Sequence, residues 1–85
     1  MKTQEQLLKD LQQNGFEIYT LEEEEKDFGN SDSDLIDEMK SLNCSILLHN
    51  GYMARNWYFT TLDALVEFFQ NGGKVGYDDA NRRIA

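Results

Sequence analysis

The sequence contains no proline and one cysteine, and its 16 aspartates and glutamates outnumber its 8 lysines and arginines. Without proline it has no rigid spacer of the kind that separates domains. Cys44 has no second cysteine to form an internal disulfide with, which agrees with a reducing compartment. No apolar run approaches the length of a membrane span, and the N-terminus lacks a signal-peptide core. We therefore expect a cytoplasmic protein that does not span a membrane.

The shortage of basic residues also limits the possible partners. The formal net charge is −8. Contact with nucleic acid backbones or anionic lipids needs lysine and arginine to replace counterions, so we expect no direct nucleic acid partner and no membrane partner. The charge favours a protein with a basic surface as the partner.

The length of 85 residues predicts one domain spanning residues 1–85. Such a chain buries roughly 60% of its unfolded surface and needs neither disulfides nor a metal to fold. An apolar content of 40%, with five Phe, four Tyr and one Trp, is too high for a disordered acidic tail.

The acidity is concentrated in one stretch of the chain. Between residues 17 and 38 there are ten carboxylates and one base, so this span carries 1 − 10 = −9. The remaining residues carry seven bases and six carboxylates, or 7 − 6 = +1. The negative charge is therefore a local feature, and it identifies a candidate surface.

The N-terminal half predicts a helix, a strand, a loop and a second helix. Thr3 and Gln6 form a capping-box pattern, and leucines follow at helical spacing until Asn14, which predicts a helix over 4–14. The segment "FEIYTL" alternates apolar and polar residues, as a half-buried strand does. We expect an acidic loop over about 22–33, then a helix that begins near Ser31 and ends at Asn43.

A β-hairpin is the clearest local pattern in the C-terminal half. Asn50-Gly51 is the residue pair typical of a two-residue type I′ turn, which predicts strands 44–49 and 52–60. In that register Leu48 pairs with Met53 and Cys44 with Trp57. One face is then assigned to the core (Cys44, Ile46, Leu48, Met53, Trp57, Phe59), and the other is expected to be half exposed (Ser45, Leu47, His49, Tyr52, Ala54, Asn56, Tyr58).

After the hairpin, Thr60 and Asp63 predict the start of a third helix, which ends at Asn71-Gly72-Gly73. The segment "KVGY" predicts a short last strand, and residues 78–85 a flexible tail. The whole chain is thus predicted to be α+β: an N-terminal helix followed by β-α-β-β-α-β, the ferredoxin-like or split βαβ order, as an antiparallel sheet with helices on one face.

Catalysis, cofactors and metals are not expected. Cys44 and His49 could form a nucleophilic pair, but on one strand their opposite parity directs them to opposite faces. Asp27 and Glu38 have the spacing of the first and last ligands of an EF-hand calcium loop. However, Gly29 and Asp32 occupy positions that need a side-chain ligand and a glycine. A calcium-binding domain remains the less favoured hypothesis.

We therefore predict a small non-catalytic protein-binding module. It would act as an inhibitor or DNA mimic that engages the basic surface of a nucleic-acid-handling protein. The alternative is a structural module that homodimerises through a sheet edge or the exposed hairpin face. The predicted partner-binding residues are the acidic side chains and two tyrosines suited to interfaces: Glu22, Glu23, Glu24, Glu25, Asp27, Asp32, Asp34, Asp37, Glu38, Tyr52 and Tyr58.

Overall fold

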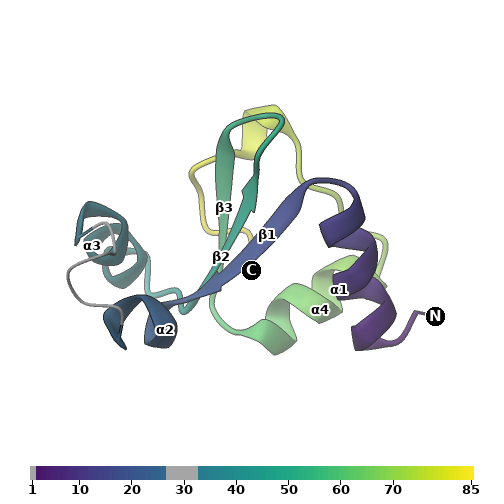
Figure 1. Ribbon diagram of the computed structural model, residues 1–85, viewed down its shortest axis with the longest axis horizontal. Coiled ribbons are helices and arrows are strands. Elements are labelled where there is room, and N and C mark those ends of the chain that lie inside the picture. Colours follow the sequence, from purple (N-terminus) through teal and green to yellow (C-terminus); the bar gives the residue numbers. More distant parts are fainter. Residues whose placement is uncertain (1, 27–32) are drawn as a thin grey trace.

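The computed structural model describes residues 2–26 and 33–85 of the chain. Its elements follow in the order α1 (Gln4–Gln13), β1 (Phe16–Thr20), α2 (Leu21–Lys26), α3 (Ser33–Ser41), β2 (Ile46–Asn50), β3 (Arg55–Phe59), α4 (Leu62–Gln70) and the 3₁₀ turn η1 (Tyr77–Asp79). Along the longest axis, α2 and α3 lie at one end and α1 and α4 toward the other (Figure 1). The predicted α+β class is confirmed.

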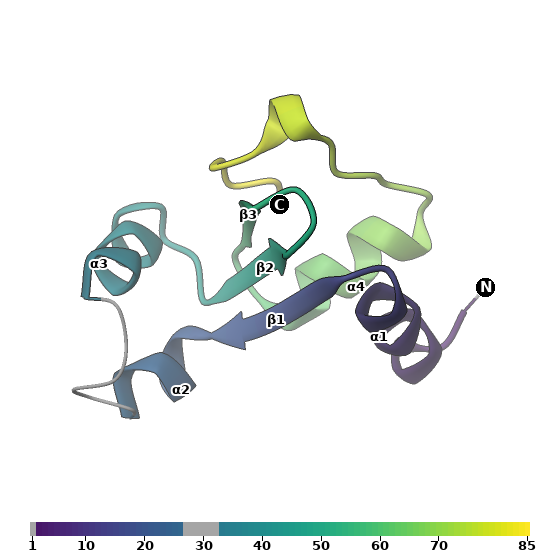
Figure 2. The same ribbon diagram turned by 45° about the horizontal axis from the view of Figure 1, so that its top comes forward.

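The strands form an antiparallel sheet in the order β1-β2-β3. The outer edge of β3 is covered by the C-terminal segment 81–85, which crosses close to β3 (Figure 2). Tyr58 donates its N–H to the Arg82 carbonyl and accepts from the Ile84 N–H, at 3.0 and 2.7 Å. This segment was predicted to be a flexible tail, but its backbone is hydrogen-bonded to β3. The predicted strand at "KVGY" is wrong, because residues 74–76 are irregular and Tyr77 begins η1.

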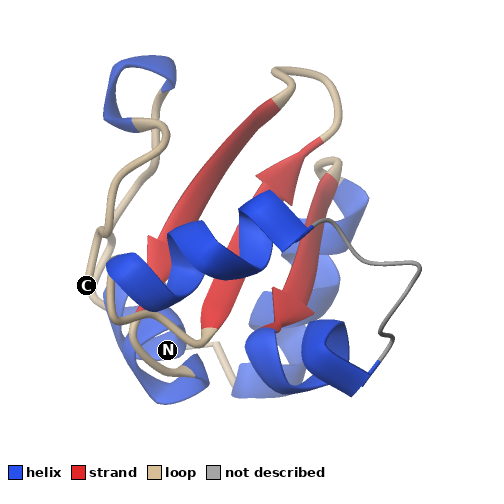
Figure 3. Ribbon diagram, turned by 90° about the vertical axis from the view of Figure 1, so that its left-hand side faces the viewer, coloured by secondary structure: helices blue, strands red, loops and turns tan. Residues whose placement is uncertain are grey.

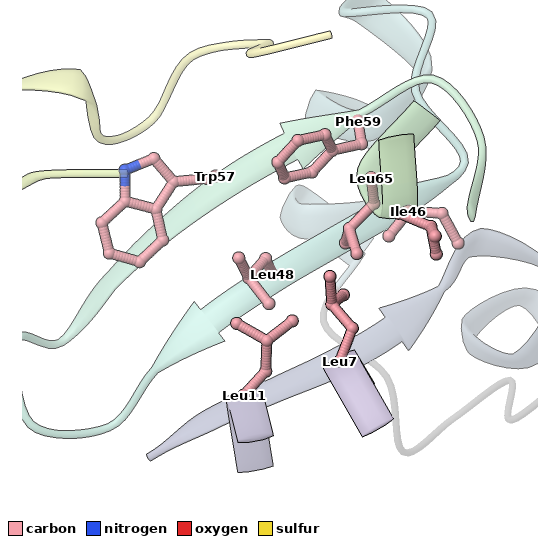
Figure 4. Close-up of a cluster of buried hydrophobic side chains, with 8 residues drawn as sticks. Leu7, Leu11, Ile46, Leu48, Trp57, Phe59 and Leu65 are labelled. Atoms are coloured by element: carbon pink, nitrogen blue, oxygen red, sulfur yellow. The ribbon is translucent and has the colours of Figure 1, made fainter. Parts of the chain in front are cut away.

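Helices cover both faces of the sheet. Apolar side chains from α1 and α4 pack on one face. Figure 4 shows Leu7, Leu11 and Leu65 of these helices against Ile46, Leu48, Trp57 and Phe59 of the strands. On the opposite face α3 lies across the strands (Figure 3). There Met39 packs in a second, smaller core with Cys44, Leu47 and Tyr58. The expectation of helices on one face is therefore wrong, and the ferredoxin-like order is not confirmed.

The capping patterns of the sequence place α1 and α4 correctly. Thr3 and Gln6 form the predicted capping box, with the Gln6 N–H 3.2 Å from the Thr3 hydroxyl. In α4 the cap is Thr61, one residue after the predicted Thr60, and its hydroxyl accepts from the Ala64 N–H at 3.1 Å. Both helices then direct a leucine stripe into the larger core.

Within β2 and β3 the hairpin faces were predicted correctly, but the turn and the face of Cys44 were not: Cys44 was assigned to the face of Ile46 and Leu48, and it packs instead in the smaller core with Leu47. Leu48 pairs with Trp57 and Asn50 with Arg55, so residues 51–54 form a four-residue loop. The Asn50 side chain is buried and accepts from the Tyr52 and Met53 N–H groups at 2.9 and 3.0 Å. These bonds stabilise the four-residue loop in place of the predicted two-residue turn. Because the register moves by an even number of residues, every strand side chain keeps its face.

No helix within residues 2–26 and 33–85 is long and apolar enough to cross a membrane.

Candidate partner-binding surface

The glutamates predicted to lie in a loop belong to a helix. The Thr20 hydroxyl accepts from the Glu23 N–H at 3.2 Å, as a capping side chain does at a helix start. Glu22, Glu23 and Glu24 lie in the first turn and Lys26 in the last, which are the signs that the helix dipole favours. The loop prediction over residues 22–26 is therefore wrong, and α2 presents the glutamates on a regular frame.

The helices α2 and α3 together form what we call the acidic lobe. Seven carboxylates and two lysines lie within α2 and α3, which gives 2 − 7 = −5: Glu22, Glu23, Glu24, Glu25, Asp34, Asp37 and Glu38 against Lys26 and Lys40. All seven except Glu24, which is half-buried, are exposed. The lobe projects from one end of the molecule (Figure 1). The structure thus brings these seven predicted residues into one region.

Ion pairs and apolar contacts hold the acidic lobe together. Lys40 of α3 lies 3.4 Å from Glu25 of α2, and Lys26 lies 3.1 Å from Glu22 one turn earlier. Beneath the helices, Leu21, Leu35 and Leu42 pack against the smaller core. Exposed ion pairs contribute little to stability, so the apolar contacts position the lobe.

Two predicted residues, Asp27 and Asp32, lie outside the described residues. Within residues 2–26 and 33–85, no three His, Cys, Asp or Glu side chains gather closely enough to hold a metal ion.

Tyr58 does not lie on an exposed face. It is completely buried under α3, so the prediction that it contacts a partner is wrong. The sequence pattern left that face half exposed because it gave no indication that α3 would cross it. Burial, and after it the neighbouring Glu38 carboxylate, raise the pKa of the Tyr58 hydroxyl to about 12. No group in the described structure has good hydrogen-bond geometry with this hydroxyl.

Tyr52 is 86% exposed in the loop of the hairpin, but it lies away from the acidic lobe. Its ring lies over Gly15, which precedes β1, whereas α2 follows the other end of that strand. A strand of five residues spans about 16 Å, so one small contact cannot include both Tyr52 and α2. The predicted site is therefore divided, and Tyr52 stands apart from it.

A polar row on the sheet was missed as a unit. Glu17 pairs with His49 across β1 and β2, and His49 pairs with Asn56 across β2 and β3. The His49 Nδ1 atom lies 2.6 Å from the Asn56 Oδ1 atom, and the Tyr19 hydroxyl donates to Glu17. That bond is the main reason why the pKa of Tyr19 is raised. The row lies beside α3 on the same sheet face. Predicting the row would have required the correct pairing of β2 with β1 and β3.

Cys44 and His49 were predicted to lie on opposite faces of one strand, and this prediction is wrong. Cys44 lies before β2 begins and packs with Leu47, which shares a sheet face with His49. Ser45 forms a bend between Cys44 and the strand, so the alternation of strand residues does not apply to Cys44. Cys44 is buried, its Sγ atom lies 3.3 Å from the Leu42 carbonyl oxygen, and burial raises its pKa. These properties describe an unreactive thiol.

A groove of about 640 Å³ lies between the C-terminal ends of α1 and α4. Apolar and polar side chains line it, among them Lys2 and Asp10, which form an ion pair. The lining contains no histidine or cysteine, and Asp10 is its single carboxylate: Lys2, Leu7, Asp10, Leu11, Asn14, Phe16, Phe69, Gln70, Gly72, Gly73, Lys74 and Val75. This lining offers no paired acid and base for catalysis.

The fold and the surface define an acidic α+β domain whose charge is concentrated on two helices at one end. Comparisons with protein-family models, with curated proteins and with solved structures found no match.

Proposed function

We propose that this protein is a non-catalytic module that binds a basic surface of another protein through the acidic lobe. The observation that carries the proposal is the concentration of charge: α2 and α3 carry −5 of the total charge of −8 and lie together at one end of the molecule. A dense charge on a folded frame attracts an oppositely charged partner and orients it as it approaches.

The proposed partner class is a protein that handles nucleic acid, which the acidic lobe would inhibit as a DNA mimic. Double-stranded DNA carries one negative charge per about 1.7 Å of axis. Four consecutive glutamates in α2, Glu22 to Glu25, supply one carboxylate per about 1.5 Å of helix axis. With Lys26 included, α2 carries 1 − 4 = −3 over six residues, or one net charge per about 3 Å of axis, which is within about a factor of two of the density of DNA. This density supports competition for a groove that normally holds phosphates.

The experiment joins capture with competition. The protein is immobilised, basic proteins are captured from a lysate at low salt and eluted with salt, and the binding of each to duplex DNA is measured by fluorescence anisotropy. We expect the free acidic protein to displace the DNA. Captured proteins that bind DNA equally well in its presence would contradict the inhibitor proposal.

A matched pair of variants tests the surface. In the first, Glu22 to Glu25 are all replaced by glutamine, which should abolish displacement. The control variant carries the same charge change on exposed residues outside the lobe: Glu5→Gln, Glu67→Gln, Asp78→Asn and Asp79→Asn. We expect it to displace DNA nearly as well as the wild type. Equal loss in both variants would mean that net charge alone acts.

Homodimerisation is the second candidate function. The outer edge of β1 favours it, because no described strand pairs there. The exposed hairpin face does not, since Tyr58 is buried. Self-association would bring together two chains that each carry −8. Sedimentation velocity at low and high salt tests this candidate. Homodimerisation requires a dimer, whereas a monomer at both salt concentrations would contradict it.

A further inference from the structure

The two edges of the sheet differ in protection. Along β3, the segment 81–85 takes up outward-facing backbone groups: besides the two bonds at Tyr58, the Asn81 N–H donates to Asn56 at 2.6 Å and the Thr60 N–H to Ala85 at 2.7 Å. At the opposite edge, β1 pairs with β2 alone among the described strands. An edge with free N–H and C=O groups is a template for another extended chain.

The hydrogen bonds at the ends of β1 show which of its groups face outward. The Leu21 N–H donates to the Ser45 carbonyl at 2.8 Å, and the Gly51 N–H to the Gly15 carbonyl at 3.1 Å. In an antiparallel pair the residues that bond to the partner alternate along the strand. Odd-numbered residues of β1 therefore bond to β2. The N–H and C=O groups of Phe16 and Ile18 point away from the sheet, where no described residue bonds to them.

The side chains beside this edge have a clear pattern. Phe16 and Ile18 are half-buried on the face of the larger core, so part of each apolar side chain is open to a neighbour. Glu17 is exposed on the other face, which it shares with the smaller core. The glutamates of α2 begin immediately after β1 ends. A neighbouring strand would meet apolar surface on one side and carboxylates on the other.

We propose that the partner of this protein contributes an extended segment of alternating basic and apolar residues, which binds as an added strand along β1. This inference rests on the proposed function, because the acidic lobe attracts the same partner. The backbone groups of Phe16 and Ile18 bond to the segment, its apolar side chains cover these two residues, and its basic side chains lie beside Glu17. Strand addition of this kind obtains affinity from main-chain bonds and specificity from alternate side chains.

Charge complementarity favours this occupant over a second copy of the chain. An antiparallel β1–β1 pair centred on Ile18 would place Glu17 beside Tyr19 of the other copy, with no base to meet the carboxylate. The acidic lobe follows the C-terminal end of β1, so antiparallel pairing would place the two lobes at opposite ends of the pair, where neither meets a basic strand. A basic segment supplies the missing base, since its lysines or arginines neutralise Glu17 and lie near α2.

Amide hydrogen exchange measured by NMR on the full chain tests the proposal. The probe is a short peptide of alternating lysine and valine with blocked ends. In the free protein the amides of Phe16 and Ile18 should exchange much faster than those of Glu17 and Tyr19. At saturating peptide, the exchange of Phe16 and Ile18 should slow by about tenfold or more. A peptide that leaves both rates unchanged would overturn strand addition.

Two modified peptides supply the backbone control. In one the valine nitrogens are methylated, and in the other the lysine nitrogens are methylated. The N–H groups of alternate residues point to opposite sides of a strand, so those of one residue type face β1. We expect protection to disappear with one methylated peptide and to persist with the other. Loss with both or with neither would contradict strand addition.

Two charge reversals supply the side-chain control. Glu17→Lys should weaken peptide binding at least about tenfold, because it replaces attraction beside β1 with repulsion. Glu67→Lys makes the same charge change at an exposed position of α4, outside the acidic lobe, and should weaken binding much less. Equal effects of the two reversals would show that only net charge matters.

The outcomes separate this inference from the proposed function. If the peptide shifts the amide resonances of α2 and α3 while Phe16 and Ile18 stay unprotected, the acidic lobe binds basic chains by charge alone and strand addition is wrong. If Phe16 and Ile18 are already protected in the free protein and sedimentation shows a dimer, a second copy occupies the edge, which also overturns the inference. If strand addition is observed but the captured proteins do not compete with DNA, the inhibitor proposal fails and this inference stands.

Discussion

Replacing Met39 with alanine tests the second core, which distinguishes this fold from a sheet with helices on one face. Met39 is completely buried between α3 and the sheet. Truncating a buried methionine to alanine costs about 2–5 kcal/mol. A domain of this size has a free energy of unfolding of about 4–13 kcal/mol. We therefore expect the variant to lose about 3 kcal/mol, a large share of the total.

Urea unfolding followed by tryptophan emission measures this loss. Trp57 is completely buried on the opposite face of the sheet from Met39, so its signal reports whether the two cores unfold together. With a slope of about 1–3 kcal/mol per molar urea, the midpoint should fall by roughly 1–3 M. Asp37→Ala, at an exposed position of the same helix, is the control and should cost within about 0.5 kcal/mol. A Met39→Ala midpoint no lower than that of the control would refute the packing of α3 on this face.

Four further predictions concern three residues. Cys44 should react slowly with a thiol reagent in native buffer and rapidly in denaturant, because burial both shields the thiol and raises its pKa; equal rates would show that it is accessible. Tyr58→Phe should keep or raise stability at neutral pH, by up to about 1 kcal/mol, since it removes a buried hydroxyl without a well-aligned partner. Folding raises the pKa of Tyr58 from 10 to about 12, so the stability of the wild type should fall as the pH rises from about 10 to about 12. The stability of Tyr58→Phe should fall less over this range. Urea midpoints that change in parallel for the two proteins would contradict this. Ala54 has a positive φ of 53°, so Ala54→Gly should raise the thermal midpoint, whereas an unchanged or lower midpoint would mean that the loop is not strained there.

The sequence predicted best what depends on neighbouring residues. The capping box of Thr3 and the end of α4 at Asn71 are local patterns, and both appear in the structure. The faces within β2 and β3 were also correct, because alternation fixes them whatever the length of the turn, whereas Cys44 precedes β2 and was assigned to the wrong face. Asn43, the predicted end of the helix that corresponds to α3, has the left-handed backbone conformation that asparagine tolerates.

The errors concern contacts between distant segments. The Asn50 side chain moved the hairpin register through bonds that the residue pair Asn50-Gly51 does not reveal. The sequence does not show which sheet face the apolar side of α3 will cover. In the structure α3 packs opposite α1 and α4 and buries Tyr58, which was expected to be exposed. The Thr20 hydroxyl caps the start of α2, and the glutamates after it form a helix where a loop was predicted.

The acidic lobe could be predicted as a charged stretch but not as a surface. The sequence alone shows that ten carboxylates lie between residues 17 and 38. Their arrangement on two adjacent helices, joined by the ion pair of Lys40 and Glu25, required the fold. The open edge of β1 next to the lobe likewise follows from the strand order and not from any motif.

The central claim is that the acidic lobe binds a basic partner, and the salt dependence of that binding tests it most directly. The dissociation constant of a captured basic protein is measured from low to physiological salt for the wild type and for the variant with Glu22 to Glu25 replaced by glutamine. We predict weaker binding and a clearly shallower dependence on salt for the variant, because four interface charges are gone. Identical constants and identical salt dependence for the two proteins would contradict the claim, since the glutamates would then lie outside the interface.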